Sequence, residues 1–235
     1  MELINGQKIT LGTCYYPEHW DKNLWREDLE RMKECGIEVI RIAEFAWSKI
    51  EPREGEFTYE FFNEFLDLAY EMNVKVIFCT PTATPPAWLT EKYPETLNAA
   101  IDGTLYRHGG RRHYNYNSPK YRELAKRIVE KSASHYGPHP AIIGWQIDNE
   151  INCEKSEFYS ESDTAAFRIW LREKYNTLDT LNEAWGLSLI HILSLFITSV
   201  FSEVCRVPVY LRHSILDRRI MRVSAIPSGI NCGWL

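Results

Sequence analysis

Strand-like and helix-like segments alternate four times within residues 1–186, and this alternation limits the chain to one fold class. Short apolar runs of strand length occupy residues 9–16, 39–42, 74–79 and 141–147. Segments with apolar residues at helical spacing follow them, at residues 21–35, 58–70, 118–129 and 162–175. Strands that alternate with helices predict an α/β fold, in which helical crossovers join the strands of a parallel sheet.

Several predicted elements carry local boundary signals. Asp21 is a good N-cap for the first helix, and Gly36 ends that helix because glycine readily adopts a left-handed conformation. Ser118 and Pro119 start another helix, with proline at its first position. The segment 80–88 contains three prolines, so we expect an irregular loop there instead of a helix or a strand.

Polar and aromatic residues gather in the loops that follow the strands, whereas the connections back from helix to strand are short. That asymmetry is typical of a (β/α)8 TIM barrel, whose sites lie on the loops at the carboxyl ends of the strands. A doubly wound sheet is the alternative, but no glycine-rich turn follows the first strand. Because a complete barrel takes about 250 residues, we predict a TIM barrel truncated to about its first four β/α units.

The composition changes after Gly186. Residues 1–186 contain 22 Lys+Arg and 30 Asp+Glu, whereas residues 187–235 contain five arginines, no lysine and two acids. The apolar run 187–201 has no helical or alternating period and is shorter than the ~20 residues of a membrane helix, and residues 187–192 resemble a translated sequencing adapter. We predict that residues 1–186 form the N-terminal half of a barrel and that residues 187–235 are a non-native, disordered tail. A membrane-surface segment is the alternative for the tail, but no apolar stripe faces its basic residues.

The whole chain has the composition of an ordinary globular protein, with 45% hydrophobic and 25% charged residues. Its net charge of −5 gives no basic footprint for nucleic acid. The six cysteines form no CxxC pair and no signal peptide is evident, so we expect reduced thiols in a cytoplasmic protein.

The fourth strand-like run leads directly into Asp148, Asn149 and Glu150. The breakers Gly-Pro-His-Pro at residues 137–140 bound it on the other side, which is typical of a strand buried on both faces. Parallel α/β folds place their catalytic groups at the carboxyl ends of such strands. From this stretch alone, a structural acid in a salt bridge explains Glu150 equally well.

Five motifs lie in order along residues 10–186. They are Leu11-Gly-Thr-Cys-Tyr-Tyr-Pro-Glu-His-Trp20, Arg41-Ile-Ala-Glu-Phe-Ala-Trp47, Thr80-Pro-Thr-Ala-Thr-Pro-Pro-Ala-Trp88, Arg111-Arg-His-Tyr114 and Gly144-Trp-Gln-Ile-Asp-Asn-Glu150. Their residues and spacing resemble the N-terminal half of glycoside hydrolase family 42, whose members are β-galactosidases built on a (β/α)8 barrel.

The resemblance implies roles for three residues. Glu150 matches the general acid/base of a retaining glycosidase, which protonates the departing oxygen and then activates water. Asn149 matches the residue that binds the sugar hydroxyl next to the anomeric carbon, and Arg111 matches a substrate-binding arginine with a planar donor fork. Trp88, after the double proline, is our candidate for the rim of the site.

Two features depart from the family. Many members bind structural zinc through four cysteines, but Asn115 takes the first of those positions and residues 158–163 contain no cysteine. Cys153 alone cannot form a tetrahedral thiolate site, so we predict no metal and no cofactor. The family's nucleophile, a glutamate on the seventh strand, also has no counterpart, because Glu203 and Asp217 lie in no matching motif.

We therefore predict that the encoded protein hydrolyses terminal β-D-galactosides with retention, and that the 235-residue chain alone is inactive. The resemblance also implies a homotrimer for the intact protein, and we expect no nucleic-acid or membrane partner. Two alternatives remain open. One is another barrel glycosidase, acting on galactan, arabinosides or mannan, and the other is a non-catalytic half-barrel that binds galactosides.

Overall fold

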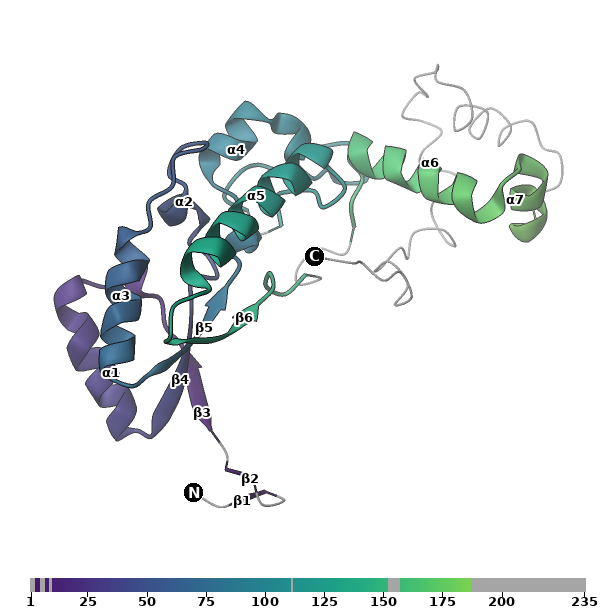
Figure 1. Cartoon of the computed structure of the whole chain (residues 1–235). Coiled ribbons are helices and arrows are strands. Elements are labelled where there is room, and N and C mark those ends of the chain that lie inside the picture. The colour runs from purple at the N-terminus through teal and green to yellow at the C-terminus, as the bar shows by residue number, and fades with distance from the viewer. Residues whose placement is uncertain (1–2, 5–6, 9, 111, 152–156, 187–235) are drawn as a thin grey trace. The chain divides into compact units, whose positions relative to one another are not determined.

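The computed structural model describes residues 3–4, 7–8, 10–110, 112–151 and 157–186, and these residues fall into two compact units (Figure 1). The first unit contains the described residues of Met1–Thr96 and Lys120–Ile151. The second contains those of Leu97–Pro119 together with residues 157–186. Arg111 and the predicted tail, residues 187–235, lie outside the described residues.

Four parallel strands form the sheet of the first unit, and they stand in the order of the sequence (Figure 1). The strands are β3 (Leu11–Cys14), β4 (Ile37–Ile42), β5 (Lys75–Cys79) and β6 (Ile142–Gln146). Each pairs with the next, so the order never reverses as it does at the switch point of a doubly wound sheet. Strands added successively in one direction build a (β/α)8 barrel, and the prediction of a partial TIM barrel is confirmed.

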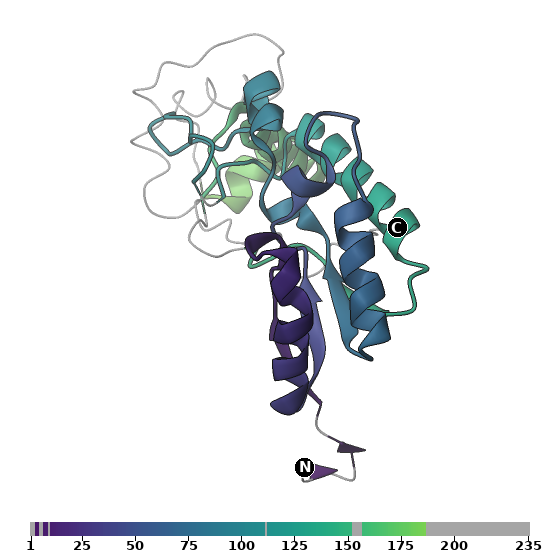
Figure 2. The same ribbon diagram turned by 90° about the vertical axis from the view of Figure 1, so that its left-hand side faces the viewer.

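The long helices of the first unit lie on one face of this sheet (Figures 1 and 2). They are α1 (Trp25–Glu34), α3 (Glu60–Glu71) and α5 (Pro119–Tyr136). The shorter elements are the antiparallel pair β1 (Leu3–Ile4) and β2 (Gln7–Lys8), the helices α2 (Trp47–Ile50) and α4 (Ala87–Lys92), and the 3-10 turns η1 (Pro17–His19), η2 (Lys22–Leu24), η3 (Pro81–Ala83) and η4 (Pro94–Thr96).

An aromatic core fills the space between the helices and the sheet. Phe78 of β5 packs against Phe62 of α3 and Tyr136 of α5, with ring centroids 5.6 and 4.7 Å away. Tyr15, just after β3, stacks on Phe65 of α3 at 5.6 Å. All five rings are buried, and each buried aromatic ring removes a large apolar area from water. Since side chains alternate along a strand, the neighbours of these core residues on each strand face the opposite side of the sheet.

The predicted boundaries hold at several points. The Asp21 side chain accepts a hydrogen bond from the backbone N–H of Asn23 at 2.9 Å, but it caps the 3-10 turn η2, and α1 itself begins at Trp25. α1 is followed by Gly36 with φ +79°, and α5 begins at Pro119, as predicted. The expectation of an irregular loop over residues 80–88 was wrong in part, because η3 forms at Pro81 and α4 begins at Ala87. Proline is tolerated in the first turn of a helix, where its missing N–H would have no intrahelical partner.

The second unit contains α6 (Glu161–Tyr175) and α7 (Leu178–Ala184). The start of α6 agrees with the prediction to within one residue, whereas α7 was not predicted. Leu171 of α6 and Leu181 of α7 are the buried centre of a small cluster that includes Phe167 and Trp170. Among the described residues, no helix is both long enough and apolar enough to cross a membrane.

Candidate active site

The chain bends sharply after β6, and the residues of this bend, Asp148, Asn149 and Glu150, are here called the strand tip. Asp148 has φ +55° and Glu150 has φ +44°, both in the left-handed region. A residue other than glycine is uncommon there, and it persists only where its surroundings impose the conformation. Glu150 is exposed, so the bend presents the predicted acid/base to solvent at the carboxyl end of β6. The expectation that this strand is buried on both faces was wrong, because Ile143 and Ile147 are 56% and 71% exposed. Among the described residues β6 is the edge strand of the sheet, so one side of it has no neighbouring strand.

Two threonines that follow β5 hold the strand tip. The backbone N–H of Asp148 donates to Thr80 Oγ1 at 2.8 Å, and Thr82 Oγ1 donates to Asp148 Oδ2 at 3.0 Å. The other carboxylate oxygen of Asp148 accepts from the backbone N–H of Asn149 at 2.5 Å. Tyr121 of α5 in turn donates to the carbonyl oxygen of Thr82 at 2.8 Å. Asp148 is therefore a buried anchor, 9% exposed, that fixes the backbone leading to Asn149 and Glu150.

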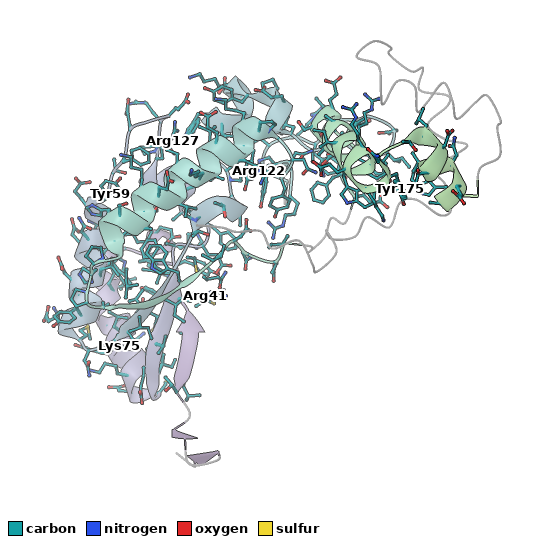
Figure 3. The ribbon with its side chains drawn as sticks, turned by 45° about the vertical axis from the view of Figure 1, so that its right-hand side comes forward. Arg41, Tyr59, Lys75, Arg122, Arg127 and Tyr175 are labelled. Atoms are coloured by element: carbon teal, nitrogen blue, oxygen red, sulfur yellow. The ribbon has the colours of Figure 1, made fainter. Side chains whose placement is uncertain are left out.

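Arg41 of β4 connects a second strand end to the strand tip. Its Nη1 donates to Oε1 of Gln146, the last residue of β6, at 2.8 Å, and its Nη2 lies 2.6 Å from Glu44 Oε2. Glu44 is buried, and Ala43 beside it has φ +70°. Figure 3 shows Arg41 and Lys75, the first residue of β5, toward opposite ends of the sheet. Left-handed residues thus follow both β4 and β6 at the carboxyl edge of the sheet.

Two further groups at this edge stay protonated more readily than usual. Both carboxylate oxygens of Glu18, in η1, are buried and have no hydrogen-bond partner among the described residues. Burial raises the pKa of Glu18 because it disfavours the charged form. Burial, with a contribution from the charge of Glu44, raises the pKa of the Cys79 thiol to about 12. Cys79 therefore remains a thiol near neutral pH and is no candidate nucleophile.

A third carboxylate, Glu51, is fully buried at what we call the Glu51 junction. It accepts from Trp47 Nε1 at 2.9 Å and from the backbone N–H of Gly55 at 2.8 Å, and it pairs with Arg127. Arg127 belongs to α5 and is labelled in Figure 3. The backbone carbonyl of Glu51 accepts from Trp88 Nε1 at 3.0 Å. The junction thus fixes the half-buried indole of Trp88, the residue predicted at the rim of the site.

The predicted site residues meet different outcomes. Asn149 and Glu150 are adjacent on the strand tip, and Trp88 belongs to the same compact unit. Arg111 lies outside the described residues, so its role stays a prediction. Its neighbour Arg112 belongs to the second unit, is 1% exposed and donates to Tyr116 Oη at 2.7 Å. Arg112 is buried in the way expected of a structural residue.

The residues present at the family's zinc position do not fit a zinc ion. Asn115 donates through its side-chain amide to Ser160 and to Asp163, and Asn117 donates to Asp163 at 2.7 Å. Ser160 and Asp163 also form the reciprocal capping box at the start of α6. An amide that is already hydrogen-bonded to the helix cap supplies no thiolate ligand. In the part of the chain that the structure describes, no group of three or more His, Cys, Asp or Glu residues could hold a metal.

Sequence reasoning missed four residues that shape the site, namely Thr80, Thr82, Arg41 and Gln146. A signal was present for the threonines, because both directly follow a predicted strand at the edge where sites lie. No such signal marked the partnership of Arg41 and Gln146, which are 105 residues apart.

Comparison with known proteins assigns the family. The family model described as "Beta-galactosidase", for glycoside hydrolase 42, matches residues 14–191, which is more than half of the chain. The chain belongs to glycoside hydrolase family 42. The resemblance in its motifs is thereby confirmed.

Individual relatives agree with this family. A β-galactosidase of Thermus thermophilus is 47% identical over 177 residues, which are 75% of this chain and 27% of the relative. The β-galactosidase Bga of Halorubrum lacusprofundi is 44% identical over 179 residues, which are 76% of this chain and 26% of the relative. This family 42 chain thus spans about a quarter of the length of these relatives.

Solved structures show the same coverage. The β-galactosidase of the psychrophilic Marinomonas ef1 is 48% identical, with a TM-score of 0.73 over 76% of this chain and 27% of that protein. Gan42B, a family 42 β-galactosidase of G. stearothermophilus, is 37% identical, with a TM-score of 0.71 over 76% of this chain and 26% of that protein. The catalytic domain of a Paenibacillus polymyxa β-amylase, 17% identical with a TM-score of 0.53, shares the fold alone.

Proposed function

We propose that this chain carries the acid/base half of a retaining β-galactosidase site, with Glu150 as general acid/base. The observation that carries the proposal is the position of Glu150, exposed on an anchored bend at the carboxyl end of β6 in a family 42 chain. The Glu150 carboxyl group gives its proton to the glycosidic oxygen as the bond from that oxygen to the anomeric carbon breaks. The resulting carboxylate then takes a proton from the water that releases the sugar.

The other predicted site residues take binding roles in this proposal. Asn149 binds the sugar hydroxyl next to the anomeric carbon, a contact that strengthens in the transition state. Arg111 holds sugar hydroxyls through its donor fork, and Trp88 offers an aromatic face at the rim. The substrate class is a terminal β-D-galactoside, because the relatives are named β-galactosidases.

A retaining mechanism also needs a carboxylate nucleophile about 5–5.5 Å from the acid/base. Asp148 is a poor choice, because its two oxygens already accept from Thr82 and Asn149. Glu44 is paired with Arg41. We therefore infer that the nucleophile is a glutamate supplied from outside residues 1–186, and that the 235-residue chain alone does not hydrolyse galactosides. A second structure of Gan42B is of a catalytic mutant in which alanine replaces a glutamate, which supports a catalytic glutamate in that relative.

A hybrid protein tests the proposal. In it, residues 10–186 of this chain replace the matching segment of the T. thermophilus β-galactosidase, and its hydrolysis of nitrophenyl glycosides is measured. We expect preference for the β-galactoside. Preference for an arabinoside or a mannoside would overturn the substrate assignment, and galactose binding without turnover would favour a non-catalytic binder.

The role of Glu150 has its own test in the same hybrid. Glu150→Gln should lower kcat/KM for phenyl galactoside by about 10² to 10⁴-fold. It should act far less on dinitrophenyl galactoside, whose leaving group needs no proton. An exposed glutamate of α1 provides the control, as Glu30→Gln. Equal losses on the two substrates would contradict an acid role.

We further propose a cytoplasmic location, a homotrimeric intact protein, and that the native part of this chain stops near Gly186, with residues 187–235 as a non-native tail. The free thiols of Cys14, Cys35 and Cys79 support a reducing compartment. A DNA read across the source locus tests the boundary. Genomic DNA that encodes residues 187–235 followed by a stop codon would remove the basis for a second half of the barrel.

A further inference from the structure

The side-chain amide of Gln146 is bonded at both of its ends. Its Oε1 accepts from Arg41 Nη1 at 2.8 Å. Its Nε2 donates to the backbone carbonyl of Asp148 at 2.9 Å and points to Asn149 Oδ1 at 3.4 Å. The two hydrogens of this amide therefore have two acceptors, and both acceptors belong to the strand tip.

The chemistry of these neighbours allows only one orientation of the Gln146 amide. A guanidinium group has five N–H donors and no acceptor, so only the oxygen of Gln146 can face Arg41. The backbone carbonyl of Asp148 can only accept, so only the nitrogen of Gln146 can face it. Glu44 holds Arg41 in place from the other side, at 2.6 Å.

The sheet explains why these residues meet. Arg41 pairs with Ile77 in the β4–β5 register, and Ile77 pairs with Gly144 in the β5–β6 register. Gln146 lies two residues beyond Gly144, so it faces the same side of the sheet as Arg41. Because Gly144 has no side chain, β6 places no side chain beside Ile77 on this face of the sheet.

The orientation of the Gln146 amide determines the orientation of the Asn149 amide. If the Asn149 amide were turned around, its nitrogen would face the nitrogen of Gln146, and two donors would oppose each other. Its oxygen therefore faces Gln146, and its NH2 group is left to donate outward. At 3.4 Å this contact is long for a hydrogen bond, so it orients Asn149 more than it binds it.

We propose that Arg41 and Gln146 are positioning residues that fix the polarity of Asn149, so that Asn149 presents N–H donors to an acceptor oxygen of the substrate. The inference rests on the proposed function, in which that oxygen is the hydroxyl next to the anomeric carbon. A substrate group at this position is then selected as a hydrogen-bond acceptor. A donor-only group, such as the protonated amine of a galactosaminide, is disfavoured.

Paired substrates in the hybrid protein test this proposal. Gln146→Met should lower kcat/KM by about tenfold for a galactoside, the loss expected from one misdirected hydrogen bond. It should leave kcat/KM nearly unchanged for the analogue that lacks the hydroxyl next to the anomeric carbon. Arg41→Met should behave like Gln146→Met, whereas Arg31→Met, on the exposed surface of α1, should change neither substrate. Equal losses on both substrates would show a purely structural role and overturn the proposal.

A reversal of polarity is a sharper test. Gln146→Glu places an acceptor where the amide nitrogen donated, so Asn149 should turn its NH2 inward and its oxygen toward the substrate. The ratio of kcat/KM for galactosaminide to that for galactoside should then rise by about tenfold over the unmodified hybrid. We call this orientation of Asn149 by Arg41 and Gln146 the relay. An unchanged ratio would contradict it.

A measurement without turnover separates this inference from the proposed function. In the 235-residue chain, Arg41→Met should shift the ¹⁵N side-chain amide resonances of both Gln146 and Asn149, and Arg31→Met should not. If the hybrid is inactive but these shifts occur, the proposed function fails and the relay stands. If the Asn149 resonance does not move, the relay fails whatever the activity.

Discussion

The Glu51 junction and the strand tip each place a glutamate among hydrogen-bonding groups of the first unit, but the two glutamates are surrounded differently. Glu51 is fully buried, and its carboxylate accepts hydrogen bonds from Trp47, Gly55 and Arg127. Glu150 is exposed, and the bonds around it converge on Asp148, two residues earlier. At the junction the glutamate is itself the connector. At the strand tip Asp148 makes the hydrogen bonds to other elements, and the Glu150 side chain is exposed.

The difference teaches how one fold assigns different work to the same side chain. A buried carboxylate that accepts several donors stabilises the structure, and its loss leaves those donors without a partner. The left-handed backbone of Glu150 costs free energy and persists because its surroundings impose it, which fits the proposed catalytic role. The comparison predicts that changes at the junction act mainly on stability and that changes at the strand tip act mainly on activity.

The largest effect on stability should come from Glu51→Ala. It leaves Arg127 and the buried N–H of Trp47 without their acceptor, so the free energy of unfolding should fall by about 3–5 kcal/mol. Urea unfolding of the 235-residue chain, followed by tryptophan fluorescence, measures this. The control is Glu56→Ala, in an exposed pair with Arg53, which should cost no more than about 1 kcal/mol. Similar losses for both variants would break the comparison.

The second unit offers a junction of the same kind at Asn115. Asn115→Ala should lower the free energy of unfolding of the 235-residue chain by about 1–3 kcal/mol, because Ser160 and buried Asp163 lose a donor. A chelator should leave the unfolding midpoint of the unmodified chain unchanged, because Asn115 supplies hydrogen bonds to Ser160 and Asp163 and offers no thiolate to zinc. A lower midpoint with the chelator would show that a metal contributes after all.

At the strand tip, Thr82→Val should lower the free energy of unfolding by about 1–2 kcal/mol, because one oxygen of Asp148 loses its buried donor. Urea unfolding measures this loss. In the hybrid this variant should also lower kcat/KM, since the bend that carries Glu150 is less firmly held. Thr90→Val provides a matched buried threonine, whose hydroxyl donates to Ala87 within α4. If Thr90→Val lowers activity as much as Thr82→Val, the strand tip has no special coupling to function.

The smallest change in stability should come from Glu18→Gln, and this variant should be more stable than the unmodified chain, whereas the variants above should be less stable. Because burial raises the pKa of Glu18 in the folded protein, the folded state binds a proton more tightly than the unfolded state does. Stability should therefore fall as pH rises from the unfolded pKa through the folded pKa, and this loss persists above it. Glu18→Gln should raise the unfolding midpoint at pH 7 and leave it unchanged below about pH 4. A lower midpoint at pH 7 would show that ionised Glu18 has a stabilising partner.

Much of the fold could be predicted because its signals are local. The helix start at Pro119 and the helix end at Gly36 depend only on neighbouring residues, and each was found where predicted. Asp21 does act as a cap, but of the 3-10 turn that precedes α1. Residues 80–88 were predicted less well. Their prolines indicated that no helix forms there, but α4 begins directly after Pro86. The position of Glu150 after the last strand also followed from the chain itself, because a strand end is a local feature.

The tertiary structure alone decided which groups surround that glutamate. Thr82 and Asp148 are 66 residues apart, Arg127 and Glu51 are 76 apart, and Arg41 and Gln146 are 105 apart. Their meetings depend on strand register and on the face of the sheet to which each side chain points, and neither can be read from a single segment. The sequence by itself determined the family 42 half-barrel and its candidate acid/base. The hydrogen bonds that hold the strand tip, and the left-handed backbone that presents Glu150, arise only when distant strands pair and their polar ends meet at one edge.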